Sequence, residues 1–355
     1  MNVLHLPTNV ASQISTTVRA LRDIGVEARG LAATEVVAES ESIKILPNAK
    51  PEFSLRAIQN IGVHSARVAR AILWADVVHW YYNSTAMGLD IRLSRILRRK
   101  GIVEFWGSDI RIPEIEAADN PYYAKYMSKL EYRDHECLAS SHRRQRAFAR
   151  HGINVLVPCR SLVPYLRQDL FTSVHHIRQR VYLPDYHPTY SEERARPLVV
   201  HSPTAPVAKG TATVERAVES LQPKLQFEYR RVMGVPHAEA LQIMRQCDIY
   251  VDQLVIGSHG LAAVEAMAFG KPVVCYIKPS MVNQYPSDLP IVNATMETLE
   301  AKLAQLIEDH ALRKELGQRG RAYVKKHHDA HTLARELTKI YQERSLPNTP
   351  SAAER

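Results

Sequence analysis

A turn bracketed by two glycines and followed by a carboxylate is the part of this chain best suited to binding chemistry. The turn, residues 257–260 (Gly-Ser-His-Gly), separates an apolar segment at 248–256 from a segment at 261–269, which predicts a strand, a tight turn and a short helix. The glycines let backbone N–H groups point outward where the helix begins, which favours an anion. Glu265 lies seven residues after Ser258, so its carboxylate projects toward the same side as the turn and can hold sugar hydroxyls. The same pattern also fits a turn that binds nothing, with Glu265 an ordinary exposed helix residue.

A Gly-Ser-Asp sequence in the first half of the chain has a similar setting. Residues 102–106 predict a strand, and Gly107-Ser108-Asp109 follows it directly. Ligands gather at the carboxyl ends of parallel strands, so Asp109 is a candidate site residue. The alternative role for Asp109 is to cap the next helix.

The elements around these residues alternate between strand and helix. Residues 2–6 and 26–31 predict strands on either side of a helix at 13–24, and residues 271–277 predict a second apolar strand after the Glu265 helix. Strands are also expected at 76–82, 136–140, 155–158, 198–202 and 227–233. Near-continuous apolar strands joined by helices predict parallel sheets covered on both faces.

Composition places the chain among soluble globular proteins. At 355 residues, with 45% hydrophobic and 23% charged residues, it is long enough for two domains. We expect no membrane-spanning helix and no secretory signal, because no run of about 20 apolar residues occurs. The four cysteines have no metal-ligand spacing, which predicts reduced thiols in a cytoplasmic protein.

Positive charge is concentrated in the N-terminal half. Residues 1–185 contain 25 Lys/Arg against 18 Asp/Glu, whereas residues 186–355 contain 21 against 19. Two clusters stand out, namely Arg92, Arg95, Arg98, Arg99 and Lys100, and Arg143, Arg144, Arg146 and Arg150. Such clusters either attract an anionic lipid, a phosphorylated acceptor or nucleic acid, or form solvated helix faces. Nucleic acid is the weakest of these options, because no nucleic-acid-binding module accompanies the charge.

Residues 257–276 (GSHGLAAVEAMAFGKPVVCY) resemble the signature of retaining family-4 glycosyltransferases, which have the GT-B fold. The family pattern is an acidic residue, a Phe-Gly two positions on, Glu-Ala-Met-Ala, a small residue and Gly-x-Pro-Val-Val. The matching positions are Gly260, Glu265, Ala266, Met267, Ala268, Gly270, Pro272, Val273 and Val274. Gly257 departs from the pattern, since it replaces an acid that in the family usually contacts the donor sugar.

The resemblance implies an α/β protein with two Rossmann-like, doubly wound parallel-sheet domains facing a cleft. We expect an N-terminal acceptor domain at 1–184 and a nucleotide-sugar domain at 185–329. A helix at 330–344 would cross back to the N-terminal domain, and a disordered tail would occupy 345–355. The Tyr-rich segment 113–132 is expected to be a helical excursion over the cleft or a membrane-facing surface.

The resemblance also implies the site residues. The expected catalytic residues are Lys209, Glu265 and Asp109. The expected donor-binding residues are Gly210, Gly257, Ser258, His259, Gly260, Leu261, Ser202, Thr204 and His237. Lys209-Gly210 fits a family Lys-Gly that grips the donor diphosphate, whereas Ser202 or Thr204 stands where the family has an Arg. No metal is expected, since the chain has no Asp-x-Asp triad and no His/Cys ligand cluster.

The function implied is transfer of a sugar from a nucleotide-sugar, UDP- or GDP-linked, to a hydroxyl of a glycan or lipid-linked acceptor. Retention of configuration is expected, and the donor is a co-substrate rather than a cofactor. We expect a cytoplasmic location, with peripheral contact at the inner face of the cell membrane through the basic half. The alternatives are a non-catalytic nucleotide-sugar-binding protein and a GT-B nucleotide-sugar epimerase.

Overall fold

The computed structural model describes residues 1–32, 43–47 and 55–343. The expected tail at 345–355 lies outside these residues. Contacts group the chain into two units, one formed by 1–111, 136–180 and 330–355 and the other by 112–135 and 181–329. No helix among the described residues is both long and apolar enough to cross a membrane.

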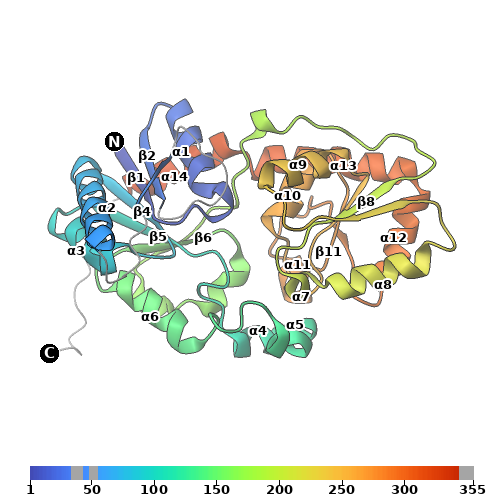
Figure 1. Cartoon of the computed structure of the whole chain (residues 1–355), viewed down its shortest axis with the longest axis horizontal. Helices are drawn as coiled ribbons and strands as arrows, with labels where there is room; N and C mark the ends of the chain where they lie inside the picture. The colour runs from blue at the N-terminus through green and yellow to red at the C-terminus, as the bar shows by residue number, and fades with distance from the viewer. Residues whose placement is uncertain (33–42, 48–54, 344–355) are drawn as a thin grey trace. The chain divides into compact units, whose positions relative to one another are not determined.

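Unit 1 is built on a seven-stranded parallel sheet, shown in Figure 1. Its strand order, β3-β2-β1-β4-β5-β6-β7, contains the 3-2-1-4-5-6 order of a Rossmann fold. The strands are β1 (Asn2–Leu6), β2 (Glu27–Ala32), β3 (Ile43–Ile45), β4 (Val77–Tyr81), β5 (Lys100–Glu104), β6 (Asn154–Val157) and β7 (Val174–His176). The helices are α1 (Gln13–Asp23), α2 (Leu55–Trp74), α3 (Leu89–Ile96), α6 (Leu138–Ala149) and α14 (Ala330–Gln342).

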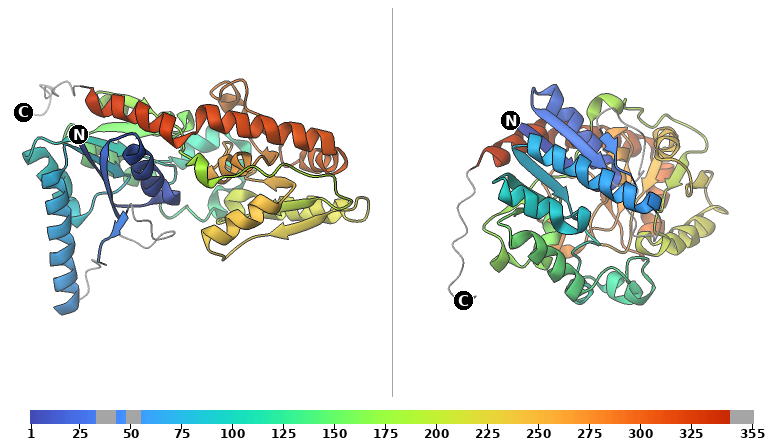
Figure 2. Two further views of the ribbon diagram at one scale, coloured as in Figure 1. Left: turned by 90° about the horizontal axis from the view of Figure 1, so that it is seen from above. Right: turned by 60° about the vertical axis from the view of Figure 1, so that its left-hand side comes forward.

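Side chains of successive residues point to opposite faces of this sheet, and each face contacts helices. Trp80 in β4 donates its indole N–H to Asp90 of α3 at 2.8 Å and packs against Phe148 of α6. Its neighbours His79 and Tyr81 point to the opposite face, where α1 and α14 pack against each other. The two views of Figure 2 show α14, the last helix, lying along unit 1 near α1.

Unit 2 is built on a five-stranded parallel sheet of order β12-β11-β10-β8-β9. Numbered within the unit, this is the flavodoxin-like order 2-1-3-4-5. The strands are β8 (Leu198–His201), β9 (Glu228–Arg231), β10 (Ile249–Val251), β11 (Val273–Cys275) and β12 (Val292–Asn293). The main helices are α7 (Pro206–Lys209), α8 (Thr211–Leu221), α9 (His237–Gln246), α10 (Leu261–Ala268), α11 (Pro279–Val282), α12 (Leu299–Glu308) and α13 (His310–His327).

Most of the predicted elements occur to within a few residues, and two predictions were wrong. Residues 136–140, expected as a strand, lead into α6, and β6 takes the place between β5 and β7. The strand expected at 248–256 ends at Val251, because the Asp252 side chain folds back onto a later turn.

The Tyr-rich segment is helical and belongs to unit 2. It forms α4 (Pro113–Asp119) and α5 (Pro121–Tyr126). Tyr123 is buried in a cluster with Ala208 and Val255, which fixes the segment on the β8 and β10 loops. The contacts therefore assign residues 112–135 to a different unit from the residues on either side of them.

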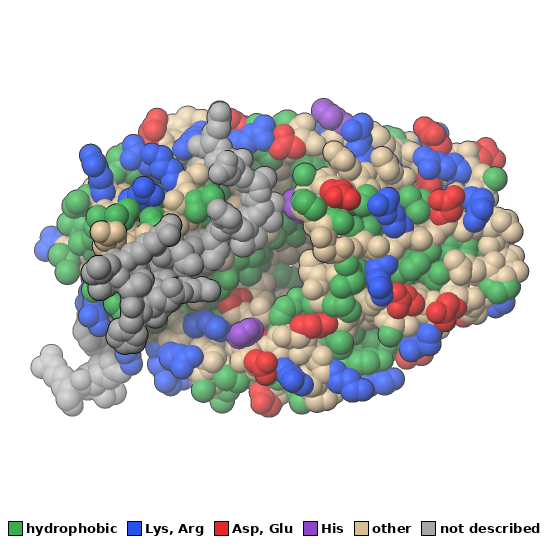
Figure 3. All heavy atoms as spheres, viewed as in Figure 1, with side chains coloured by type: hydrophobic (Ala, Val, Ile, Leu, Met, Phe, Trp, Pro, Cys, Tyr) green, Lys and Arg blue, Asp and Glu red, His purple; other side chains and the backbone are tan. Residues whose placement is uncertain are grey.

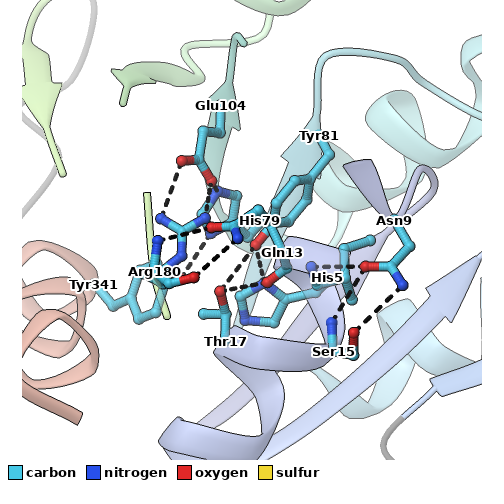
Figure 4. Close-up of polar contacts among 11 residues, drawn as sticks. His5, Asn9, Gln13, Ser15, Thr17, His79, Tyr81, Glu104, Arg180 and Tyr341 are labelled. Carbon is cyan, nitrogen blue, oxygen red and sulfur yellow. Dashed lines mark hydrogen bonds and ion pairs between the residues drawn. The ribbon is translucent and has the colours of Figure 1, made fainter. Parts of the chain in front are cut away.

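A buried polar network joins α14 to the sheet of unit 1 (Figure 4). Arg180 donates to both carboxylate oxygens of Glu104, at 3.0 and 2.8 Å. The side chains of Arg180, Glu104 and His79 are all inaccessible to solvent. His79 contacts Glu104 through Nε2 at 3.3 Å and the Tyr341 hydroxyl of α14 through Nδ1 at 2.7 Å. Gln13 at the start of α1 clamps the Arg180 backbone with two bonds of 2.9 Å. The network thus fixes α14 and also Arg180, the residue that precedes the 181–329 segment of unit 2.

The network predicts acid sensitivity of unit 1. Burial lowers the pKa of His5 and His79, so both are neutral in the folded state. The unfolded chain binds these protons below about pH 6.5, so stability is full above that pH and falls as the pH drops, by about 1.4 kcal/mol per pH unit for each histidine. All three tryptophans, Trp74, Trp80 and Trp106, lie in unit 1. Denaturant unfolding followed by tryptophan fluorescence between pH 7.5 and 5 should show this loss.

The His79→Gln variant tests the assignment. It should be less stable at pH 7.5 but show a shallower pH dependence, whereas His135→Gln, at an exposed position, should follow the wild type. A slope that is the same in all three proteins would contradict the role given to His79.

Candidate functional site

The candidate site lies where the strand order of unit 2 reverses. β8 and β10 are neighbours in the sheet, but the chain leaves them in opposite directions, toward β9 and toward β11. The loops that follow both strands, 202–211 and 252–260, begin at the same edge because the strands are parallel. In open parallel sheets this switch point is where ligands bind.

An ion pair joins the two loops. Lys209 Nζ lies 2.5 Å from Asp252 Oδ1, and Asp252 Oδ2 accepts the Gly260 N–H at 2.8 Å. The Asp252 side chain is inaccessible, while 14% of the Lys209 side chain remains exposed. Burial favours the neutral acid, but the Lys209 ammonium and the Gly260 N–H lower the pKa of Asp252 below its usual value. Lys209 therefore keeps its charge and has ammonium hydrogens left for a ligand.

Two glycines make room for this pair. A Cβ on Gly260 would lie 3.3 Å from Lys209 Nζ and 3.4 Å from Asp252 Oδ2. Gly210 has a φ of +72°, and a Cβ there would approach the Leu254 Cβ to 2.9 Å. A larger residue at either position would push the loop that carries Lys209 away from Asp252.

His201 holds the end of the loop that carries Lys209. This buried residue at the end of β8 contacts the Val251 carbonyl at 2.9 Å and the Thr211 hydroxyl at 3.0 Å. Burial lowers the pKa of His201 to about 4, so the ring is neutral at pH 7. It joins β10 to the first residue of α8, immediately after Lys209 and Gly210.

Glu265 lies on α10 and is held by two side chains. Its Oε1 accepts the Tyr186 hydroxyl at 2.9 Å and contacts His237 Nε2 at 3.1 Å. The hydrogen bond to Glu265 raises the pKa of His237. The Glu265 side chain is 8% exposed and that of His237 31%, so a ligand that reaches Glu265 meets His237 as well.

The turn before α10 is well ordered by its neighbours. Gly257 has a φ of +75°, and its carbonyl accepts the Lys278 N–H at 2.9 Å. Gln253 donates its side-chain amide to the Ser258 carbonyl. His259 is buried, and its ring packs 4.8 Å from Tyr285. Ser258 and Leu261 remain partly exposed.

Both the sequence of unit 2 and the fold of the whole chain are similar to those of known proteins. Residues 174–339, which include unit 2 from β8 onward, match a family model described as glycosyl transferase-like. Sucrose-phosphate synthase from Thermosynechococcus elongatus aligns over 96% of this chain and 98% of its own, with a TM-score of 0.65 and 14% identity. HepE of Anabaena, solved with UDP and glucose, aligns over 97% and 100%, with a TM-score of 0.66 and 14% identity.

The chain has the GT-B fold. A third structure of this fold, WaaG, a glycosyltransferase involved in lipopolysaccharide biosynthesis, aligns over 97% of this chain and 100% of its own, with a TM-score of 0.62 and 11% identity. No curated protein matches the sequence.

In this GT-B protein other groups occupy the space that a side chain at position 257 would need. A Cβ on Gly257 would lie 2.9 Å from Asn120 Nδ2 and 3.0 Å from Lys278 Cβ. Lys278 is buried between Glu116 and Asp119 of α4, at 2.8 and 2.9 Å. Asn120 binds both Glu116 and the Val255 carbonyl. The glycine therefore lets α4 and α5 dock on the turn.

The remaining predicted residues have mostly local partners. Ser202 donates its hydroxyl to the Val232 carbonyl at 3.3 Å, and Thr204 is exposed. Asp109, in unit 1, accepts the Trp106 N–H at 3.0 Å and the Gly107 N–H at 2.5 Å. Burial raises the pKa of Asp109 to about 6, against the effect of these amides. Its carboxylate thus stabilises the turn after β5.

Sequence analysis missed three groups at the site. Asp252 was not among the expected site residues, although it pairs with Lys209. Tyr186 was missed entirely, although it binds Glu265. Glu131 accepts the Val207 and Ala208 N–H groups at 2.7 and 3.2 Å, at the start of α7. A carboxylate that ends an apolar strand, as Asp252 does, is the one signal that the sequence offered.

Within the described residues, no three His, Cys, Asp or Glu side chains come together as a metal site would require.

The packing at Gly257 predicts that a side chain there destabilises unit 2. Gly257→Ala should cost about 1 kcal/mol for the left-handed backbone and roughly 1–3 kcal/mol more for displacing Asn120 and Lys278. Gly234→Ala is the matched control, because Gly234 has a φ of +70° and a Cβ there meets nothing within 4 Å. Calorimetric unfolding, with hydrogen exchange of residues 248–269, measures the difference. Equal stability of the two variants would contradict the docking of Asn120 and Lys278 described here.

Proposed function

We propose that the chain transfers a sugar from a nucleotide-sugar, UDP- or GDP-linked, to a hydroxyl acceptor. The observation that carries this proposal is the partly exposed, charged Lys209 at the switch point, beside the start of the helix that carries Glu265. Both residues lie in the segment that matches a glycosyl transferase-like family. The structural neighbour HepE, solved with UDP and glucose, has the same fold.

Each part of the donor has a proposed partner. Glu265 accepts hydrogen bonds from the ribose hydroxyls, and Tyr186 and His237 hold its carboxylate in place for them. The diphosphate lies at the N-terminus of α10, where backbone N–H groups and the helix dipole favour an anion. The Gly260 N–H is excluded from this role because it is bound to Asp252. Lys209 supplies the positive charge.

Lys209 acts on the leaving group in this proposal. As the bond between the anomeric carbon and the phosphate oxygen breaks, negative charge develops on the diphosphate, and a charge already in place stabilises it. Asp252 raises the pKa of Lys209 against the effect of burial. The ammonium and helix amides here provide the stabilisation that a bound cation can provide elsewhere.

The acceptor hydroxyl completes the reaction. Its oxygen forms the new bond to the anomeric carbon, and its proton passes to the departing phosphate. Attack from the face that the phosphate leaves would retain the configuration, as the family resemblance implies. A hexose as the transferred sugar and a glycan or lipid-linked acceptor complete the proposal.

A nucleotide-sugar-binding protein without transfer activity is the second candidate. Two observations favour it, namely that Asn120 and Lys278 fill the place of the family acid and that the charge of Lys209 is already paired with Asp252. Incubation with UDP- and GDP-sugars and hydroxyl acceptors, followed by analysis of the products, separates the two. Nucleotide release with a new glycoside supports transfer, and binding without turnover across the panel supports the second candidate.

The proposed contacts predict that substitutions of Glu265 and Lys209 affect the affinities for nucleoside and nucleoside diphosphate differently. Glu265→Gln should weaken nucleoside and nucleoside diphosphate by the same factor, about 10-fold or more, because it removes a charge from the ribose site. Lys209→Gln should weaken only the diphosphate, by a similar factor, and should also lower stability because Asp252 loses its partner. Titration calorimetry with UDP, GDP, uridine and guanosine measures both.

Lys224→Gln serves as the control, since Lys224 is exposed and pairs with Glu300 far along the sequence from the site. It should bind like the wild type. If Lys209→Gln lost uridine and UDP affinity equally, the phosphate role of Lys209 would be wrong. If the wild type bound none of the four compounds, the proposed function would fail.

A further inference from the structure

Helix α3 of unit 1 has an exposed face on which apolar and basic side chains alternate. Leu89, Arg92 and Ile96 are spaced three and four residues apart and share this face. Leu89 is 50% and Ile96 76% exposed, and Met87 in the preceding turn is 92% exposed. Figure 3 shows Lys and Arg side chains among hydrophobic ones at the edge of the molecule where α2 and α3 lie.

The turn before α3 presents Met87 at a conformational cost. Ala86 and Met87 have φ values of 48° and 56°, in the left-handed region that non-glycine residues avoid. Gly88 follows with a φ of 81°. A methionine that is strained and almost fully exposed gains nothing from folding of the monomer, which points to a contact made outside the chain.

The arginines of two separate sequence clusters meet at this face. Arg95 donates to the Arg150 carbonyl at 2.8 Å. Burial, together with the charges of Arg95, Arg92 and Arg150, lowers the pKa of His151. Arg92 and Arg95 of the first cluster and Arg150 of the second thus contribute to one basic surface.

Among the described residues of α2 and α3, little negative charge offsets this surface. The only acid of α3, Asp90, is buried, accepts hydrogen bonds from Trp80 and Thr85, and has its pKa raised to about 6 by burial. Within the described side chains of α2, Arg67 and Arg70 are exposed and no acid occurs. Asp76, after α2, binds the Asn2 N–H. The charge that these two helices present to solvent is therefore positive.

We propose that Met87, Leu89 and Ile96, with Arg92, Arg95 and Arg98 around them, dock on an anionic lipid surface. The arginines bind lipid phosphates, and the apolar side chains enter the boundary between head groups and acyl chains. Neither nucleic acid nor a soluble polyanion accounts for three exposed apolar side chains between the arginines. This surface belongs to unit 1, and the proposal does not depend on the sugar transfer proposed for unit 2.

Vesicle sedimentation tests the proposal with the full chain and no nucleotide-sugar. The wild type should sediment with vesicles of phosphatidylcholine and phosphatidylglycerol, not with phosphatidylcholine alone, and salt should weaken binding. Arg92→Glu with Arg98→Glu should lower the affinity at least about 10-fold, because each lost arginine is worth roughly fivefold. Met87→Ser with Ile96→Ser should also lower it and leave the salt dependence unchanged.

The matched control carries the same change of charge on unit 2. Arg196→Glu with Lys314→Glu alters two exposed residues and should bind like the wild type. Equal loss in this control and in the arginine variant would show a net-charge effect and overturn the docking surface. Absence of vesicle binding by the wild type, or tighter binding to a single-stranded oligonucleotide that ignores the Met87 and Ile96 substitutions, would overturn it as well. Circular dichroism of each variant shows whether it is folded.

Discussion

The ion pair between Lys209 and Asp252 is the interaction on which the candidate site depends. An unpaired charge at this depth would cost several kcal/mol, so neither residue can be charged in this fold without the other. The pair requires β8 and β10 to be neighbours, Gly260 to have no side chain, and His201 to hold the loop after β8. Strand order, glycine position and buried histidine are thus parts of one arrangement.

Segment 112–135 packs against the turn that contains Gly257. Tyr123 and Asn120 dock on the loops of unit 2, and Lys278 turns toward Glu116 and Asp119. Glu131 of the same segment occupies the backbone amides at the start of α7. A side chain at position 257 would collide with Asn120 and Lys278, so this docking requires the glycine.

The sequence alone predicted most of the fold because apolar, β-branched runs and glycine stops are local signals. The helix α2 was missed, although His64, Val68 and Ile72 repeat at helical spacing on its buried face. The placement of Glu265 on α10 followed from the same local reasoning. The partners of Lys209 and Glu265 could not be found in this way, since Asp252 and Tyr186 lie 43 and 79 residues from them. Residues 136–140 were wrongly predicted as a strand because so short a segment carries no clear period.

The family resemblance leads us to expect an Arg near Ser202, and the chain has none. For the proposed diphosphate this difference is one of geometry, because a guanidinium binds two phosphate oxygens at once and an ammonium does not. In the proposed site Lys209 would therefore attract the diphosphate by charge, and backbone N–H groups at the start of α10 would orient it. The course of the turn at 257–261 would then decide the geometry of the donor.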